Sequence, residues 1–91
     1  MKQEKVFADL YIHLHADKPM QAASQVKRHL QATAGVVSVY FGDACRQSLH
    51  IAYNPRHIAA EALLNVVRLY SSKAVRVASI ITRAPALNAG S

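Results

Sequence analysis

The stretch Leu49–Leu64 changes its hydrophobic period from 2 to 3.6 within a few residues. Leu49, Ile51 and Tyr53 alternate with their neighbours, and Asn54-Pro55 follows before apolar residues recur at helical spacing. Alternation is typical of a strand with one buried face, and the longer period is typical of an amphipathic helix. The stretch therefore predicts a strand that turns directly into a helix, so that a half-buried sheet is backed by a helical layer.

The N-terminal half of the chain predicts a second copy of this plan. Val6–His15 alternates between two kinds of side chain, which indicates another half-buried strand. We expect a helix to follow, with Asp17 as its N-cap, Pro19 in its first turn and Gly35 as its C-terminal cap. Its buried face is predicted to consist of Ala23, Val26, Leu30 and Ala34.

Three further elements complete the predicted order. Val36–Phe41 is rich in β-branched and aromatic residues and predicts a strand, which a short connection joins to the strand at Gln47–Tyr53. Val75–Thr82 predicts the last strand. For the helix that follows Pro55, the spacing predicts one buried face and an outer side. The expected buried residues are Ile58, Ala62, Val66 and Leu69, with Leu63 and Tyr70 on the flank and Leu64 and Val67 on the outer side.

The predicted fold is therefore α+β, a ferredoxin-like βαββαβ sandwich. Right-handed crossovers place both helices on one face of an antiparallel sheet with strand order 4-1-3-2. We expect residues 1–83 to form a single domain and residues 84–91 a flexible C-terminal tail.

Composition narrows the class of protein. Of the 91 residues, 52% are hydrophobic and 18% charged, which is typical of a globular chain. No apolar run approaches the roughly 18 residues of a membrane span, and the N-terminus lacks the pattern of a signal peptide. A single cysteine cannot form an internal disulfide, so a cytoplasmic protein is expected. The net charge of +6 favours acidic partners, although the basic residues are dispersed along the chain.

Two segments carry a resemblance to a known family. They are Gly35-Val36-x-x-Val39-x-Phe41 and Leu49-x-Ile51-x-Tyr53-Asn54-Pro55-x-x-Ile58, with Leu63 following. The pattern resembles the heavy-metal-associated (HMA) domain family of small copper, zinc and mercury chaperones and modules of metal-pumping ATPases, and it covers about Phe7 to Ile80. The resemblance implies a ferredoxin-like fold and a metal site of two cysteines two residues apart. At those positions this chain has Pro19 and Ala22, which cannot bind metal.

A non-standard metal site based on histidine is the leading functional hypothesis. His13, His15 and His50 are predicted to project from the helix-free face, with His13 close to His50 and His15 nearer Ser48. Cys45 lies in the connection at the same end of the sheet. Imidazole and thiolate ligands would suit zinc, copper or nickel. If they bind no metal, these side chains are ordinary polar residues on the solvent-exposed face of the sheet.

The alternative is a non-metal adaptor that self-associates or docks an acidic partner. Phe7, Tyr11, Tyr40 and Ile80 would leave the open face apolar, as Leu64 and Val67 would the second helix. A less favoured interpretation is an anion-binding pocket formed by Lys18, Arg46 and Lys73.

Two other classes are disfavoured. Nucleic-acid binding is not expected, because the outward positions of the third predicted strand lack the aromatic pair of an RNA-recognition sheet. An enzyme is not expected either, since the acidic residues form no pair for acid–base chemistry.

Overall fold

The computed structural model describes the backbone of residues 5–84 and the side chains of residues 6–81. In this part of the chain the element order is the predicted βαββαβ. The elements are β1 (Lys5–His13), α1 (Pro19–Gln31), β2 (Val36–Phe41), β3 (Ser48–Tyr53), α2 (Ala60–Arg68) and β4 (Val75–Ala84). Neither helix has the length and hydropathy that crossing a membrane requires.

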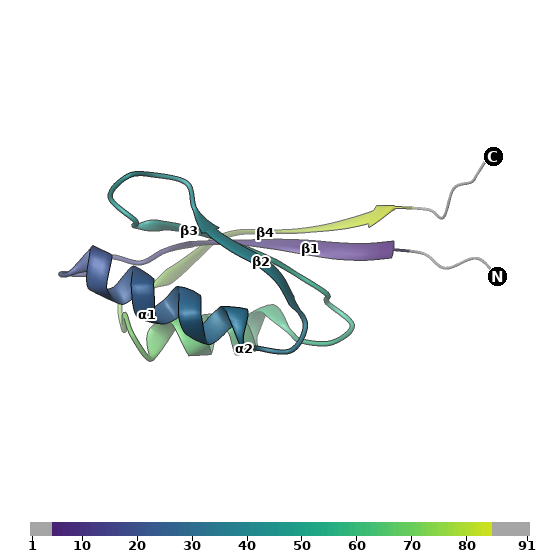
Figure 1. Cartoon of the computed structure of the whole chain (residues 1–91). Coiled ribbons are helices and arrows are strands. Elements are labelled where there is room, and N and C mark those ends of the chain that lie inside the picture. The colour runs from purple at the N-terminus through teal and green to yellow at the C-terminus, as the bar shows by residue number, and fades with distance from the viewer. Residues whose placement is uncertain (1–4, 85–91) are drawn as a thin grey trace.

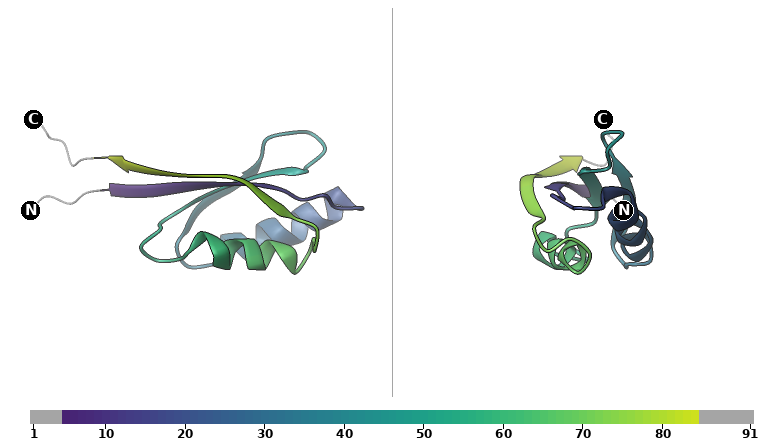
Figure 2. Two further views of the ribbon diagram at one scale, coloured as in Figure 1. Left: turned by 180° about the vertical axis from the view of Figure 1, so that it is seen from behind. Right: turned by 90° about the vertical axis from the view of Figure 1, so that its left-hand side faces the viewer.

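The strands form one antiparallel sheet in the order β2-β3-β1-β4, which is the expected order read from the opposite edge. Both helices lie against the same face of this sheet (Figure 1). Seen along the strands, α2 lies on the β4 side and α1 on the β2 side (Figure 2). The other face has no helix over it, and this arrangement is compatible with a ferredoxin-like fold.

The core fills the space between sheet and helices. It follows the alternation of the two central strands, because every second side chain of β1 and β3 faces the helices. The largest fully buried side chains are Leu10, Ile12, Leu14, Val26, Leu30, Leu49, Ile51, Leu63 and Val67. The prediction that Val6–His15 and Gln47–Tyr53 are half-buried strands is thus confirmed, with slightly shorter bounds.

The structure corrects the predicted faces of α2. Leu64 and Val67 are buried beside Leu63, whereas Leu69 is 71% exposed and Ala62 is also exposed. The buried residues, at positions i, i+1 and i+4, share one side of the helix, and so do the residues that were expected to be buried. Periodicity alone therefore allows two rotations of α2 about its own axis. Only packing against the sheet decides between the two rotations.

The ends of α1 also differ from the prediction. Lys18, not Asp17, is the N-cap residue, and no side chain caps the helix there. The helix ends at Gln31, and Ala34 is exposed rather than part of the buried face. Gly35 lies in the turn that follows, where its φ of +95° favours a residue without a side chain.

One end of the sheet is a two-stranded arm. β3 pairs with Ala8–His13 only, so Lys5–Phe7 pairs with the end of β4 alone. In Figure 1 this arm extends beyond the helices. Ala84 belongs to β4, and the rest of the predicted tail lies outside the described residues.

Candidate functional site

An aromatic and carboxylate cluster surrounds His50 on the helix-free face. The ring of His50 stacks on that of Tyr11, with centroids 4.4 Å apart and planes 12° apart. Tyr40 meets the same imidazole edge to face at 4.5 Å. Nε2 of His50 lies 2.9 Å from Oδ1 of Asp9. We call these four residues, Asp9, Tyr11, Tyr40 and His50, the His50 cluster.

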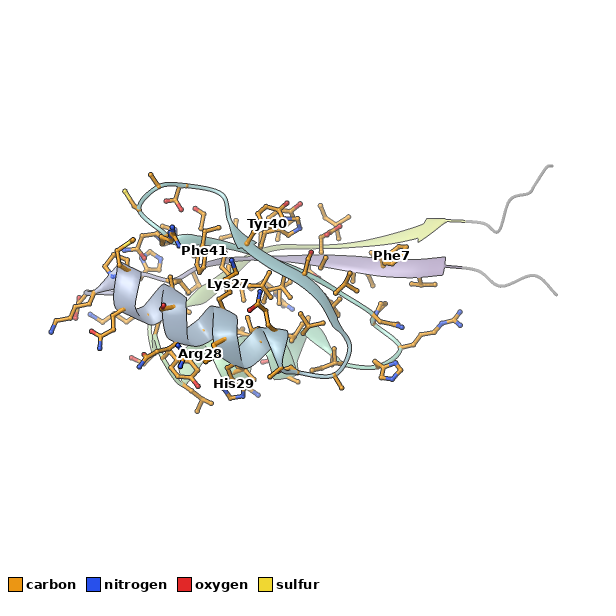
Figure 3. The ribbon with its side chains drawn as sticks, in the orientation of Figure 1. Phe7, Lys27, Arg28, His29, Tyr40 and Phe41 are labelled. Carbon is orange, nitrogen blue, oxygen red and sulfur yellow. The ribbon has the colours of Figure 1, made fainter. Side chains whose placement is uncertain are left out.

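Strand register brings the cluster together. Tyr11 of β1 and Tyr40 of β2 both lie opposite His50 of β3, so three adjacent strands each contribute one ring to the same face. Asp9 precedes Tyr11 by two residues and therefore points to that face as well. Figure 3 shows Tyr40 on the side of the sheet away from the helices.

The contact with Asp9 decides which ring nitrogen of His50 is available. An ionised carboxylate only accepts hydrogen bonds, so the proton lies on Nε2, which donates to Asp9. In the neutral ring Nδ1 then has the free lone pair. A carboxylate that orients an imidazole in this way is the usual partner of a histidine that binds a metal or accepts a proton. The side chain of His50 is only 13% exposed, which limits access to that lone pair.

His13 and His15 form a second histidine group. Their ring centroids lie 4.0 Å apart in an edge-to-face arrangement. His15 has a φ of +52°, which is uncommon for a residue with a side chain and turns the chain out of the sheet. His13 does not lie directly opposite His50, because His13 lies opposite Ser48 and His50 lies opposite Tyr11, so the two are diagonal neighbours.

The reason for this displacement lies at the end of β1. The prediction carried the strand to His15, whereas the strand ends at His13. Gln47 holds the departing chain, since its backbone oxygen accepts from the Leu14 N–H and its side chain bonds both backbone groups of Ala16. The chain therefore leaves the sheet two residues earlier than expected.

A shallow pocket of about 340 Å³ lies on the open face beside the cluster. His13 and His50 both line it, together with Tyr11, Tyr40 and Val77. The pocket thus brings two of the four predicted metal ligands to one surface, although they do not face each other across the strands. Its walls are mostly aromatic and aliphatic, which favours an apolar group as occupant.

Cys45 is separate from both histidine groups. It is exposed in the β2–β3 connection, which Asp43 shapes by accepting the backbone N–H groups of Gln47 and Ser48. Within residues 5–84, no three His, Cys, Asp or Glu side chains come close enough together to hold a metal ion. The metal role of His13, His15, His50 and Cys45 therefore stays a prediction.

The two positions that the resemblance aligns with the HMA cysteines do not fit a metal. Pro19 is the first residue of α1, and Ala22 is buried one turn later. Neither side chain has a donor atom, so the thiolate site of that family has no equivalent here. The loop before α1 is held instead by the Gln47 side chain through its two bonds to Ala16.

The expected anion pocket is formed in part. A cavity of about 330 Å³ at this end of the sheet is lined by His15, Asp17, Lys18 and Lys73, with Arg46 absent from its walls. Ser71 lines the cavity too, and its hydroxyl donates to the Leu14 carbonyl at 2.6 Å. The Asp17 carboxylate opposes an anion, so the two lysines do not form a purely basic site.

Several contacts were missed from the sequence. Spacing along the chain assigns Asp9 no role, yet it is the partner of His50. Gln47 and Ser71 bond to the segment that follows β1, and no spacing rule marks either one. The sequence does contain a signal for Asp9. It lies two residues before Tyr11 and so shares a strand face with it, and that strand is expected to pair with the strand of His50.

Large apolar side chains are exposed on the open face and along one edge. Phe7, Tyr40 and Ile80 belong to the open face, as predicted. Val77 and Ile81 add to them on the edge strand β4. We call these five residues, Phe7, Tyr40, Val77, Ile80 and Ile81, the apolar surface.

A scan against protein-family models and a search of curated proteins find no match to this chain. What the chain does is therefore inferred from its own side chains.

Proposed function

We propose that this chain is a non-catalytic module of HMA-like, ferredoxin-like fold that works by contact with another protein chain, namely a second copy of itself. The observation that carries the proposal is the apolar surface defined above. Its residues lie on strands rather than singly in loops, and β4 alone contributes three of them. On a small domain, exposed apolar groups of this kind favour an interface, because covering them removes apolar area from water.

The distribution of acidic groups supports a binding role over a catalytic one. Asp9 is engaged by His50, and Asp43 accepts two backbone N–H groups of its own loop. Asp17 lies in the loop between β1 and α1, and Glu61 lies on α2. A pair of carboxylates for general acid–base work is therefore missing from the described residues, and the proposal assigns no reaction.

Sedimentation equilibrium across the micromolar range tests the proposal, with ionic strength as a second variable. We expect the mass of two chains at the upper concentrations. Because the chain carries a net charge of +6, two copies repel each other, and added salt should strengthen self-association by screening. An acidic partner would instead be released by salt. The mass of one chain at every concentration and salt level would overturn the proposal.

A second candidate function is metal binding at the open face, which one specific arrangement favours. His50 has its Nε2 oriented by Asp9, and its pocket is shared with His13, whose ring touches His15. Neutral imidazole nitrogens bind zinc, copper(II) or nickel, and a carboxylate behind the ring raises the basicity of the ligand. The residues assigned to this role are His13, His15 and His50, with Cys45 as a further thiolate ligand for copper(I).

Titration of the tag-free protein with Zn(II), Cu(II), Ni(II) and, under reducing conditions, Cu(I) tests this candidate. We expect 1:1 sub-micromolar binding that the double variant His13→Ala/His50→Ala loses. His57→Ala is the matched control, because His57 is an exposed imidazole in the β3–α2 connection. Equal binding by the double variant, or loss in the control, would exclude the site.

A further inference from the structure

β4 is an edge strand whose outer side is open to another strand. Among residues 5–84 it pairs with β1 alone, through nine of its ten residues from Val75 to Ala84. Edge strands are usually protected from foreign strands by shortness, charged side chains or proline. Between Arg76 and Arg83 the strand has no charged side chain and no proline, and Val77 and Ile81 are 67% and 62% exposed.

The opposite edge offers a shorter regular segment. β2 has six residues, and its register with β3 shifts between Val36 and Ser38, so that Val37 is an extra residue in the strand. Such a bulge interrupts the row of backbone groups that a foreign strand would need. β4 has a shift of its own, where Val77 is the extra residue, but Ala78–Ala84 beyond it pairs regularly.

The occupant that best fits this regular segment is the same segment of a second copy. A two-fold axis perpendicular to the sheet makes the two β4 strands antiparallel and keeps both open faces on the same side. Residues that lie opposite each other in such a pair must point to the same face. Ile80 lies opposite Asp9, on the open face, and Ile81 opposite Ala8, on the helix side, so registers centred on Ile80 or Ile81 are both allowed.

The bulge at Val77 separates these two registers. Centring on Ile80 would set Val77, the extra residue, opposite position 83 of the other copy. Centring on Ile81 pairs Ala78–Ala84 with the same segment of the other copy and uses only regular backbone. A bulge interrupts the row of backbone groups that the pairing needs, so the register centred on Ile81 is favoured.

Ile81 at the centre also explains its exposure. Its partner Ala8 is fully buried, yet Ile81 is largely exposed on the helix side of the sheet. In the favoured register the two Ile81 side chains cover each other across the axis. Because α2 lies on the β4 side of the helix layer, the α2 helices of the two copies would flank this contact (Figure 2).

We propose that β4 joins two copies of this chain edge to edge, so that two four-stranded sheets become one continuous sheet with Ile81 on the two-fold axis. This inference names the partner surface of the proposed self-association and rests on it. It commits to a backbone-paired edge contact, in contrast to a contact made by the open face alone.

Disulfide trapping tests the register directly. In a Cys45→Ser background, Ile81→Cys should form a covalent dimer on mild oxidation, because opposite residues of antiparallel strands have the Cα separation that a disulfide needs. Val37→Cys is the matched control, since Val37 is equally exposed on the other edge strand. A dimer band for Val37→Cys but not for Ile81→Cys would overturn the inference.

A charge at the same position tests the contact energetically. Ile81→Lys places two ammonium groups against each other and should raise the dimer Kd at least about tenfold, whereas Val37→Lys should change it by less than about twofold. Far-UV circular dichroism checks that both variants are folded, and if Ile81→Lys is unfolded the trapping result decides. If the wild type is a dimer, but Ile81→Cys is not trapped and Ile81→Lys leaves the dimer Kd unchanged, the β4 contact is overturned and self-association stands. A wild-type monomer would overturn both.

Discussion

On the helix side of the β1–β3 ladder, Leu10, Ile12 and Ile51 are almost completely buried, whereas on the open side Tyr11 and His50 contact each other at the edge of solvent. Both sets come from the same two strands by simple alternation. The covered side is stabilised by the burial of apolar area, and its close packing tolerates little change in side-chain shape. The open side is stabilised by particular contacts, above all the hydrogen bond from His50 to Asp9. This difference leaves the open side free to carry a binding function.

The largest expected effect is on the covered side. Leu10→Ala removes a side chain that is 0% exposed in the central strand, and it should lower the free energy of unfolding by about 3 kcal/mol. The cause is lost apolar burial together with the cavity that remains. Urea denaturation followed by circular dichroism measures it. A loss below about 1 kcal/mol would mean that the two faces differ less than their burial indicates.

The next effect is expected at the centre of the open face. His50→Ala leaves Asp9 without its partner and removes two ring contacts, which should cost about 1–2 kcal/mol of unfolding free energy. Ser48→Ala, two residues earlier on the same face, is the control and should be close to neutral. If both variants lose the same amount, the stability of this face comes from general strand propensity rather than from the His50 cluster.

A smaller quantity is the coupling between two rings of the cluster. In a double-mutant cycle of Tyr40→Ala and His50→Ala, we expect a coupling free energy of about 0.5–1 kcal/mol, because the edge-to-face contact is lost once in either single variant. The four unfolding free energies are measured under identical conditions. Additive losses would contradict a direct interaction between the rings.

The smallest effect is expected when a hydroxyl group is added to an alanine on the open face, in comparison with the same change on the covered face. Ala52→Ser adds a hydroxyl on the open side and should change the free energy of unfolding by less than about 0.5 kcal/mol. Ala8→Ser, at a position of β1 that is 0% exposed, is the matched comparison and should cost about 1–2 kcal/mol, since the new hydroxyl is buried. Thermal unfolding of both variants measures the difference. Equal losses would remove the distinction between the faces.

Most of the fold followed from hydrophobic pattern, and most of the errors came from geometry that pattern does not contain. The alternation in Val6–His15 placed Leu10 inside and Tyr11 outside, as observed. Ile58 and Val66 of the expected face do pack against the core, but Leu64 and Val67 are buried and not on the outer side, because the stripe that contains them is as periodic as the expected one. Of the candidate site, the open-face placement of His13 and His50 was correct, and the two are diagonal neighbours rather than directly opposite.

The sequence by itself determined the element order, the inward side chains of the central strands and the apolar character of β4, because these depend on spacing along the chain. Only the tertiary structure decided that Asp9 orients His50 and that His15 turns away to meet His13. It also decided that Ile81 is exposed although its strand partner Ala8 is fully buried. The physical reason is register: sliding β1 by two residues against β3 keeps every side chain on its face but changes which side chains meet.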